Sequence, residues 1–464
     1  MELEVLWLPG DWDDPDVIRK LNSKPGLLAL ATEKTTNPIT GQPHLVNVPF
    51  LSPGGQSREL AGWSWYMMSL GLLVHNQVHL VKSMVTNLCF SIQHYGKVLP
   101  ANRSYYLDCS QPPFLTDMAL LVYDRIRSEP GALEFLRVAI LAAIKEYYQV
   151  WMGSDRLDLS TGLSRYRPRK KRLSPEMDVA DLLPILRRFA DGRGMGIKEY
   201  VKAYNGQEIS EPDLDKYLLH KRATLESGHD GSFRLEGKAA DLVTVDLNCL
   251  LYKYEVDIAH AIQSHFNDNL PVTAGFAAAA SSMKVGEVHT SAVWTRRAKL
   301  RKARVDRYLW NENKKMYFDY NTTTNTQATY ESATTLYPLW AGLCHPHQAA
   351  LLTSAALPAL ECRGGLVAGT ADSVPLPEKR REWDYPLGWA PHQLMAWIGL
   401  ARYGYVEEVE RLAYKWLWTV TKVFVDYNGV VAEKYDVTNG IDPQHAGEGI
   451  LSRNEDFKGI PKEG

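Results

Sequence analysis

Two acidic residues stand in short polar motifs that could carry acid–base chemistry. Asp230 ends the stretch SGHD and Glu433 lies in AEKYD, each in a loop among glycine, aromatic and basic residues. Two such carboxyl groups could act as a general acid and a general base. Acidic residues are also common in exposed loops, and about two hundred residues separate these two. Their spacing alone therefore does not pair them.

Aromatic and polar side chains gather in three further stretches. These are PGGQSRELAGWSWY at 53–66, NRSYYLDCSQPPF at 102–114 and EWDYPLGWAPHQ at 382–393. Flat aromatic faces beside amide, hydroxyl and carboxylate groups suit a sugar-like ligand. An ordinary loop, a helix cap or aromatic residues that pin a loop to the core would explain the same residues structurally.

The remaining motifs do not indicate a metal, a cofactor or a nucleic acid. CHPH at 344–347 offers three possible ligands, but no second cluster stands at zinc-site spacing. GRGMG at 192–196 follows a helix-like stretch and not a strand, so it predicts a helix end and not a dinucleotide loop. The basic run at 296–307 is interrupted by apolar residues, which favours a solvated helix face.

Composition and charge narrow the function classes further. The 464 residues include 52 Lys plus Arg and 54 Asp plus Glu, a net charge of −2 that gives no drive toward nucleic acid or an anionic membrane. No apolar run approaches the ~18 to 20 residues that span a bilayer. The N-terminus is acidic and has no signal-peptide core, and the five cysteines are odd in number and widely spaced. We expect a cytoplasmic protein with a small-molecule ligand and leave its oligomeric state open.

The elements that must position these motifs are predicted to be helices. Helical periodicity recurs between Gly, Pro and Asn breaks from about residue 60 onward, and strand alternation is scarce. We predict helices at 239–266, at 406–427, and after a start signal that ends with Pro130. The core face of the helix after Pro130 is expected to hold Leu133, Leu136, Ile140, Ile144 and Tyr147. That of 406–427 is expected to hold Val409, Leu412, Ala413, Trp416, Val420, Val423, Phe424 and Tyr427.

Helix, polar loop and helix recur as a unit along the chain. Loops that join successive helices around a ring gather at its ends, which is how a helical barrel builds a binding site. No linker rich in Ser, Gly or Pro divides the chain. We therefore predict an N-terminal lead-in strap at 1–50, followed by one helical domain at 51–464.

Seven stretches together resemble the successive motifs of the trehalase family, in particular its fungal neutral type. They are PGG…ELAGWSWY, NRSYYLDCSQPPFLTDMAL, SGHD, LWNENKKMYFDYN, YESATTLYPLWAG, EWDYPLGWAPHQ and AEKYDV, spread over residues 25–464. The resemblance implies an all-α (α/α)6 toroidal barrel and the inverting hydrolysis of α,α-trehalose to two glucoses. It implies Asp230 as general acid and Glu433 as general base. Its sugar-contacting positions fall on Trp63, Asn102, Gln111, Glu176, Gly228 and Trp383.

The chain departs from the family pattern at charged sugar contacts. Gln56 and Cys109 stand where the family has arginines, and Ser64 stands where it has an aspartate. Charged hydrogen bonds contribute roughly 1.5 to 3 kcal/mol each, so three losses could slow hydrolysis by three orders of magnitude or more. Glu382 replaces a glutamine, and the chain stops before the family's closing segment, so we expect the barrel to be incomplete at its C-terminus.

These departures leave three functions open. The first is an enzyme that keeps the acid and base pair but acts through a less charged site on a different glycoside or a more apolar molecule. The second is an α,α-trehalase that hydrolyses trehalose to glucose with inversion. The third is a non-catalytic, trehalase-like binding or regulatory protein.

Overall fold

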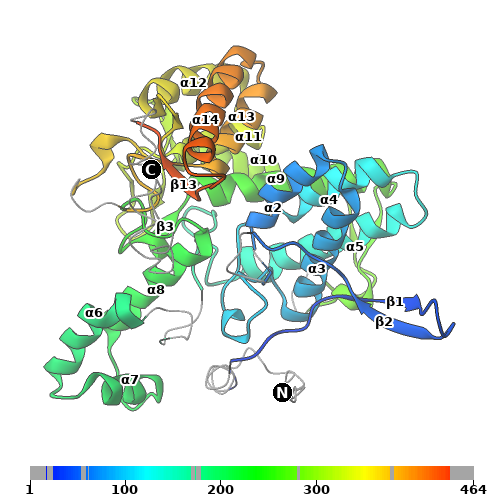
Figure 1. Ribbon diagram of the computed structural model, residues 1–464, viewed down its shortest axis with the longest axis horizontal. Helices are drawn as coiled ribbons and strands as arrows, with labels where there is room; N and C mark the ends of the chain where they lie inside the picture. Colours follow the sequence, from blue (N-terminus) through cyan, green and yellow to red (C-terminus); the bar gives the residue numbers. More distant parts are fainter. Residues whose placement is uncertain are drawn as a thin grey trace. The chain divides into compact units, whose positions relative to one another are not determined.

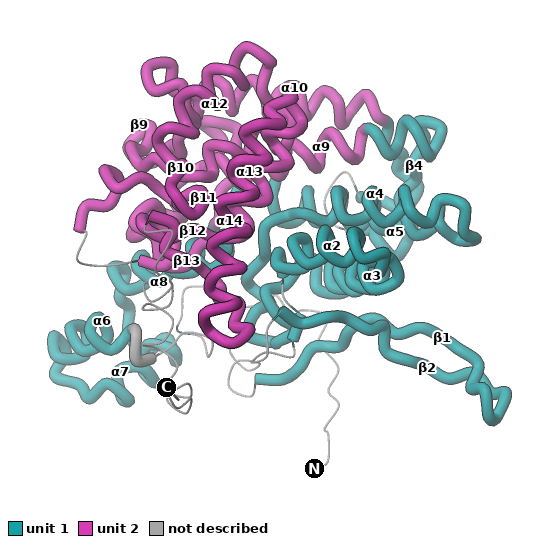
Figure 2. Tube along the Cα trace, turned by 45° about the horizontal axis from the view of Figure 1, so that its top comes forward, with its two compact units in different colours: residues 1–156, 167–228, 260–290 teal, residues 157–166, 229–259, 291–464 magenta. Residues whose placement is uncertain are grey.

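The computed structural model describes residues 25–53, 59–60, 62–168, 173, 179–278, 283–376 and 381–438, together with Val17. Helices dominate, and the strands are short (Figure 1). None of the helices in these ranges has both the length and the hydropathy needed to cross a bilayer. The chain divides into two compact units (Figure 2). Unit 1 comprises residues 1–156, 167–228 and 260–290, and unit 2 comprises 157–166, 229–259 and 291–464.

Unit 1 is built on helices that bury apolar faces against one another. Its helices are α2 (Ser64–Val74), α3 (Val78–Tyr95), α4 (Leu115–Ile126), α5 (Ala132–Glu146), α6 (Val179–Gly192), α7 (Ile197–Asn205) and α8 (Pro212–Ser227). Helices α3, α4 and α5 pack against one another. A second core joins α6, α7 and α8 through side chains that include Leu186, Tyr200 and Leu218. Its hairpin pairs β1 (Thr32–Thr36) with β2 (Pro43–Asn47), and β4 (Leu270–Pro271) pairs with β5 (Val288–His289).

Unit 2 combines long helices with short antiparallel ladders. Its helices are α10 (Ser291–Tyr308), α11 (Tyr337–Trp340), α12 (Pro346–Leu360), α13 (Ala390–Arg402), α14 (Val406–Asp426) and α9 (Val245–His265) up to Ala259. Its ladders are β3 (Leu242–Val243) with β8 (Tyr320–Asn321) and β9 (Thr326–Gln327), β6 (Trp310–Asn311) with β7 (Met316–Tyr317), β10 (Glu361–Cys362) with β11 (Gly365–Leu366), and β12 (Leu387–Trp389) with β13 (Lys434–Asp436). Helix α13 packs between α11 and α14.

The expected helices are present, with shifted ends and partly wrong faces. Helix α5 begins two residues after Pro130. Leu133 lies on the same helix face as Ile140, seven residues later, but it stands in the first turn of the helix and is 43% exposed. Of the core face predicted for 406–427, Leu412, Trp416 and Val423 are buried in α14. Val409, Ala413 and Val420 are half-buried, and Phe424 and Tyr427, the residue after α14, are exposed. Helix α9 begins at 245, after a short 3-10 turn and β3. The predicted helix end at GRGMG is confirmed, since α6 stops at Gly192.

The basic run at 296–307 lies on α10, as expected for a helix, but it is not uniformly solvated. Arg301 is buried and its Nε donates to Glu255 Oε1 at 2.9 Å. The predicted boundary between a strap and a domain at residue 50 stays a prediction.

Candidate active site

The loop that carries Asp230 leaves α8 through a glycine that no other residue could replace without strain. Gly228 caps the helix with φ of 74°. A Cβ at this position would lie 2.5 Å from Trp63 Nε1. Glycine alone tolerates both the left-handed backbone and this close approach. The local structure therefore explains the glycine of the SGHD motif.

The backbone that follows Asp230 is held by the buried carboxylate of Asp384. Ser232 Oγ donates to Asp384 Oδ1 at 2.8 Å, and the Phe233 N–H donates to Oδ2 at 2.9 Å. The Tyr330 hydroxyl donates to the same carboxylate. Burial raises the pKa of Asp384, although these three donors act in the opposite direction. Asp384 belongs to the EWDYP motif, so that motif fixes the loop around Asp230.

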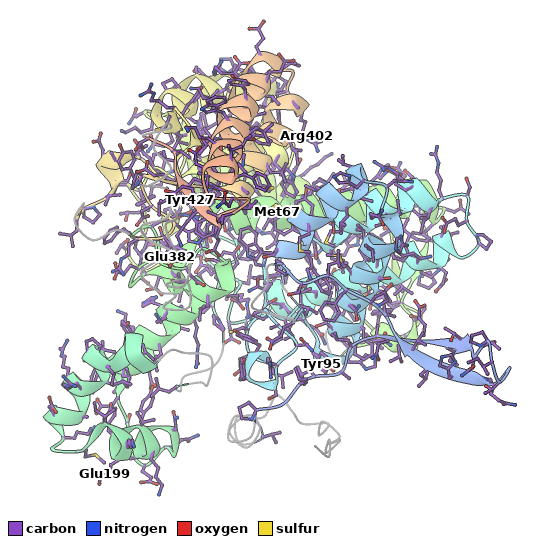
Figure 3. All side chains as sticks on the ribbon, viewed as in Figure 1. Met67, Tyr95, Glu199, Glu382, Arg402 and Tyr427 are labelled. Carbon is purple, nitrogen blue, oxygen red and sulfur yellow. The ribbon has the colours of Figure 1, made fainter. Side chains whose placement is uncertain are left out.

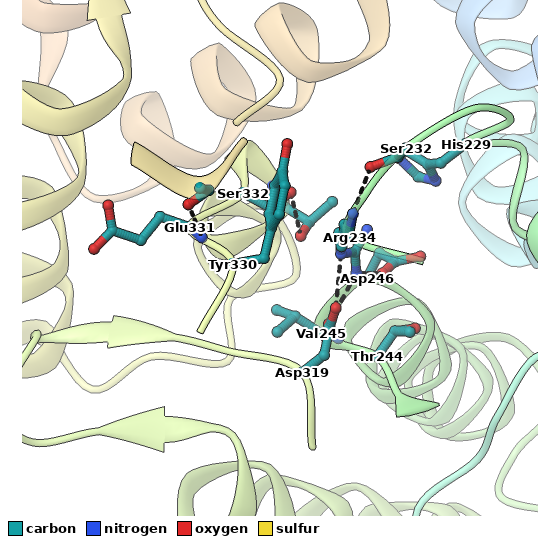
Figure 4. A network of polar contacts seen from close by, with 12 residues as sticks. His229, Ser232, Arg234, Thr244, Val245, Asp246, Asp319, Tyr330, Glu331 and Ser332 are labelled. Carbon is teal, nitrogen blue, oxygen red and sulfur yellow. Dashed lines mark hydrogen bonds and ion pairs between the residues drawn. The ribbon is translucent and has the colours of Figure 1, made fainter. Parts of the chain in front are cut away.

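A buried arginine between two aspartates anchors the other end of this loop (Figure 4). Arg234 Nη2 lies 2.5 Å from Asp246 Oδ1, and Arg234 Nε lies 2.7 Å from Asp319 Oδ2. Burial by itself would raise the pKa of Asp246, but the Arg234 guanidinium, together with His229 and the Tyr166 hydroxyl, outweighs it and holds that pKa below its ordinary value. The Val245 N–H donates to Asp319 at 2.9 Å. The three charges therefore lock the loop onto the start of α9.

Two buried histidines meet beside Asp230. His229 Nε2 and His392 Nε2 are 3.1 Å apart, so one ring donates to the other. The rings stack at 5.3 Å, and His229 also meets Trp383 edge-on at 4.7 Å. Burial lowers the pKa of His392 well below its ordinary value, and the nearby His229 and Arg234 lower it further, while Asp246 acts in the opposite direction. The His392 ring is therefore neutral in the folded protein at neutral pH.

Acidification is expected to destabilise the protein through His392. The folded state resists protonation of this ring, whereas the unfolded chain takes up a proton below about pH 6.5. The stabilising contribution is thus complete above that pH and is lost as the pH falls toward the lower pKa of the folded state. The test measures the free energy of unfolding by urea at about pH 7.5 and about pH 5.5. The decrease between the two pH values should be smaller for His392→Gln than for the wild type. His347→Gln, at an exposed histidine, is the matched control and should lose as much stability as the wild type. If His392→Gln also loses as much as the wild type, His392 is not the group that destabilises the protein in acid.

The antiparallel strands β12 and β13 place Lys434, the residue after Glu433, opposite Trp389 of the EWDYPLGWAPHQ motif. The Trp389 ring stacks on Trp383 at 3.8 Å and 5°. The Trp383 N–H donates to the Gly231 carbonyl at 3.1 Å. A continuous set of contacts in unit 2 therefore runs from β13, which begins directly after Glu433, to the Asp230 loop.

The two candidate catalytic carboxylates lie in different settings. Asp230 is partly buried and its Oδ1 atom is shielded from solvent, whereas the Glu433 side chain is 67% exposed. A general acid must keep its proton for the leaving oxygen, and a general base must reach a water molecule. The enclosed position of Asp230 and the open position of Glu433 are compatible with these two roles.

Other expected sugar contacts gather in unit 1, near the start of α2. The Trp63 N–H donates to Gln111 Oε1 at 3.5 Å, and its ring stacks on Phe114 at 6.4 Å. Gln111 also fills the space beside Gly62, where a Cβ would lie 2.5 Å from Oε1. The structure thus brings Trp63 together with both Gln111 and Gly228.

Three further residues of unit 1 were expected to contact a sugar: Asn102, Ser64 and Cys109. Asn102 Oδ1 accepts a hydrogen bond from the Leu60 N–H at 3.2 Å, so its amide supports the chain before α2. Ser64 is the first residue of α2 and is partly exposed. Cys109 carries a buried thiol. Gln56 and Glu176 lie outside the described residues.

Charged groups on α8 were missed by the sequence reasoning. Arg222 is fully buried six residues before Gly228. Glu226 is buried as well and accepts hydrogen bonds from the Ser110 N–H at 2.9 Å and from the Arg167 N–H at 3.0 Å, and it pairs with Arg156. The sequence held one signal for them: Arg222 and Glu226 are four residues apart just before SGHD, a spacing that puts both on one helix face.

Metal-ligating side chains do not cluster anywhere in the part of the chain that the structure describes. His345 of the CHPH motif caps α12 by accepting from the His347 N–H at 3.4 Å. This motif therefore has a local structural role.

A family profile and two similar curated proteins agree on the family of this chain. A profile described as Trehalase matches residues 1–464. The chain is 54% identical to the cytosolic neutral trehalase of Neurospora crassa, over 100% of this chain and 62% of that protein. It is 56% identical to the cytosolic neutral trehalase of Emericella nidulans, over 97% of this chain and 60% of that protein. The chain thus spans about three fifths of the length of these curated relatives.

Solved structures define the fold class. Neutral trehalase Nth1 from Saccharomyces cerevisiae matches with a TM-score of 0.87 at 47% identity, over 92% of this chain and 76% of that chain. A GH63 mannosylglycerate hydrolase from Thermus thermophilus shares the fold alone, with a TM-score of 0.55 at 15% identity, over 84% of this chain and 91% of that chain. The expected all-α (α/α)6 fold class is confirmed. Within this class, the chain belongs to the trehalase family.

Proposed function

We propose that this protein is an α,α-trehalase that hydrolyses trehalose to two glucoses with inversion. The observation that carries the proposal is the family match over residues 1–464, with relatives at 54% and 56% identity that are named cytosolic neutral trehalase. It favours the second of the three functions that the sequence left open. The altered signature positions count against it, but specific contacts hold the loop that carries Asp230 and the strand that begins directly after Glu433.

In this proposal Asp230 is the general acid and Glu433 the general base. Asp230 protonates the glycosidic oxygen as the bond to the anomeric carbon breaks. Glu433 takes a proton from the water that attacks this carbon on the opposite face, which inverts its configuration. Trp63, Asn102, Gln111, Glu176, Gly228 and Trp383 are proposed as sugar contacts, with Gln56, Ser64 and Cys109 at the altered positions. The reaction needs no cofactor or metal.

A second candidate function follows from the altered positions. A hydroxyl at Ser64 and a thiol at Cys109 make the expected sugar contacts less charged than those of the family pattern. A less charged site is less costly for an apolar group to occupy. A different glycoside, or a more apolar molecule, is therefore the alternative substrate.

Incubation of the purified chain with trehalose distinguishes these functions. Glucose release that is absent from Asp230→Asn supports the trehalase proposal. Release at least about a hundredfold below that of a relative with the full first signature would support the weakened site, because each lost charged contact removes about tenfold or more. With no release at all, mass spectrometry of a metabolite extract passed over the protein would show whether it binds or cleaves another molecule.

Restoring the family's charges is expected to raise glucose release cooperatively. Gln56→Arg, Ser64→Asp and Cys109→Arg together should exceed the combined effect of the single changes, since groups on one sugar ring fix the orientation that the others need. Steady-state kinetics of the single and triple variants measure this coupling. Circular dichroism checks that the triple variant is folded, because Cys109 is buried and arginine is larger. Purely additive or absent gains in a folded variant would exclude these positions as the limiting factor.

We also infer a cytoplasmic location. All five cysteines are free thiols, as expected for a reducing compartment. The relatives' names agree with this location. A helical domain at 51–464 preceded by a strap, and a barrel that is incomplete at its C-terminus, remain predictions.

A further inference from the structure

Lys434 is a buried cation placed directly beside the proposed general base. Only 5% of its side chain is exposed, and its Nζ lies 5.1 Å from the centre of the Trp389 ring. The β12–β13 ladder fixes its backbone opposite Trp389. A lysine held this way has little freedom to move its stem, since the ladder fixes one end and the aromatic face attracts the other.

The ammonium of Lys434 is shared between two carboxylates. Its Nζ lies 3.7 Å from Glu433 Oε2 and 3.6 Å from Glu382 Oε1. Both distances exceed the ~2.7–3.2 Å of a direct N–H···O hydrogen bond. A single positive charge cannot fully neutralise two anions, so each carboxylate weakens the hold of Lys434 on the other.

Glu382 is held in place by its backbone. Its carbonyl accepts from Trp389 Nε1 at 2.7 Å, and the residue after it, Trp383, donates to Gly231. A side chain at Gly231 would lie 3.6 Å from the Glu382 Cγ. Glu382, labelled in Figure 3, therefore lies next to the Asp230 loop while its carboxylate faces the cation beside Glu433.

We propose that Lys434 is a positioning residue that orients Glu433, and that Glu382 competes for its ammonium and weakens this orientation. Among the described residues, the side chain of Glu433 pairs with Lys434. With two thirds of its side chain exposed, Glu433 has little packing to set its rotamer. The inference rests on the proposed role of Glu433 as general base.

Glu382→Gln is the central test, because it keeps the side-chain size and removes the competing charge. A crystal structure of this variant should show the Lys434 Nζ to Glu433 Oε2 distance shortened from 3.7 Å into the hydrogen-bond range of ~2.7–3.2 Å. In trehalose hydrolysis, kcat should rise about threefold or more with KM within about twofold, since only the geometry of the base improves.

Lys434→Met tests the same role in the opposite direction. We expect kcat to fall about tenfold or more with little change in KM, because a misplaced base loses part of the ~10²–10⁴-fold that general-base catalysis supplies. Lys434→Arg keeps the charge and should recover most of this loss, whereas Lys434→Gln should not. Lys415→Met, which removes a lysine paired with Glu361 at 2.7 Å on α14, is the matched control and should retain wild-type kinetics.

The outcomes separate the inference from the proposed function. If the wild type hydrolyses trehalose, the inference is overturned when Glu382→Gln leaves either kcat or the distance from Lys434 Nζ to Glu433 Oε2 unchanged. It is also overturned when Lys434→Met raises KM and leaves kcat unchanged. If the wild type releases no glucose, the proposed function fails, and the crystal structures decide alone. A shortened distance in Glu382→Gln then supports the orientation of Glu433 by Lys434, and an unchanged distance overturns it.

Discussion

Glucose release from trehalose should fall by at least about a thousandfold in Asp230→Asn and in Glu433→Gln. Each substitution keeps the shape of the side chain and removes proton transfer, which supplies ~10²–10⁴-fold for each group. In an inverting reaction neither carboxylate can stand in for the other, because one protonates the leaving oxygen while the other acts on the opposite face. Steady-state kinetics of the purified variants measure the loss.

Matched substitutions show whether this effect is specific. Asp372→Asn and Glu407→Gln change exposed acidic residues in unit 2 and should leave kcat and KM at wild-type values. Circular dichroism and thermal unfolding should be unchanged in all four variants. Wild-type turnover in Asp230→Asn or Glu433→Gln would remove that residue from the mechanism, and the other acidic residues of the loop and strand would then need the same test.

Arg234→Met should be the most destabilising of the substitutions considered. It leaves the buried carboxylates of Asp246 and Asp319 without the guanidinium that neutralises both. Breaking a buried ion pair by removing one partner costs about 3–5 kcal/mol, because a buried charge is left uncompensated. Urea unfolding at neutral pH measures the change in the free energy of unfolding.

Two further variants test the physical reason. Arg411→Met removes an exposed arginine paired with Glu361 at 2.8 Å and should cost less than about 1 kcal/mol. Adding Asp246→Asn and Asp319→Asn to Arg234→Met should recover part of the loss, since no buried charge then remains. A loss below about 1 kcal/mol in Arg234→Met would show that the buried charges do not hold the loop.

The sequence alone was sufficient for the family, the fold class and most helices. Helix periodicity is a local property, so the pattern from Leu136 to Ile144 predicts a buried face that the structure confirms. The exposed side chain of Leu133 shows the limit of this reasoning. A pattern predicts which residues could face a core, but the neighbouring helices decide how far that core extends. The same limit applies to Phe424 at the end of α14.

Only the tertiary structure decided which side chains meet around the candidate catalytic residues. His229 and His392 are 163 positions apart in sequence, and Arg234 and Asp319 are 85 apart. No local pattern relates such residues, because their contact depends on how loops and ladders are held by the rest of the unit. The register of β12 against β13 likewise sets Lys434 opposite Trp389. A shift of one residue would turn its side chain to the other face, since neighbouring residues of a strand point in opposite directions.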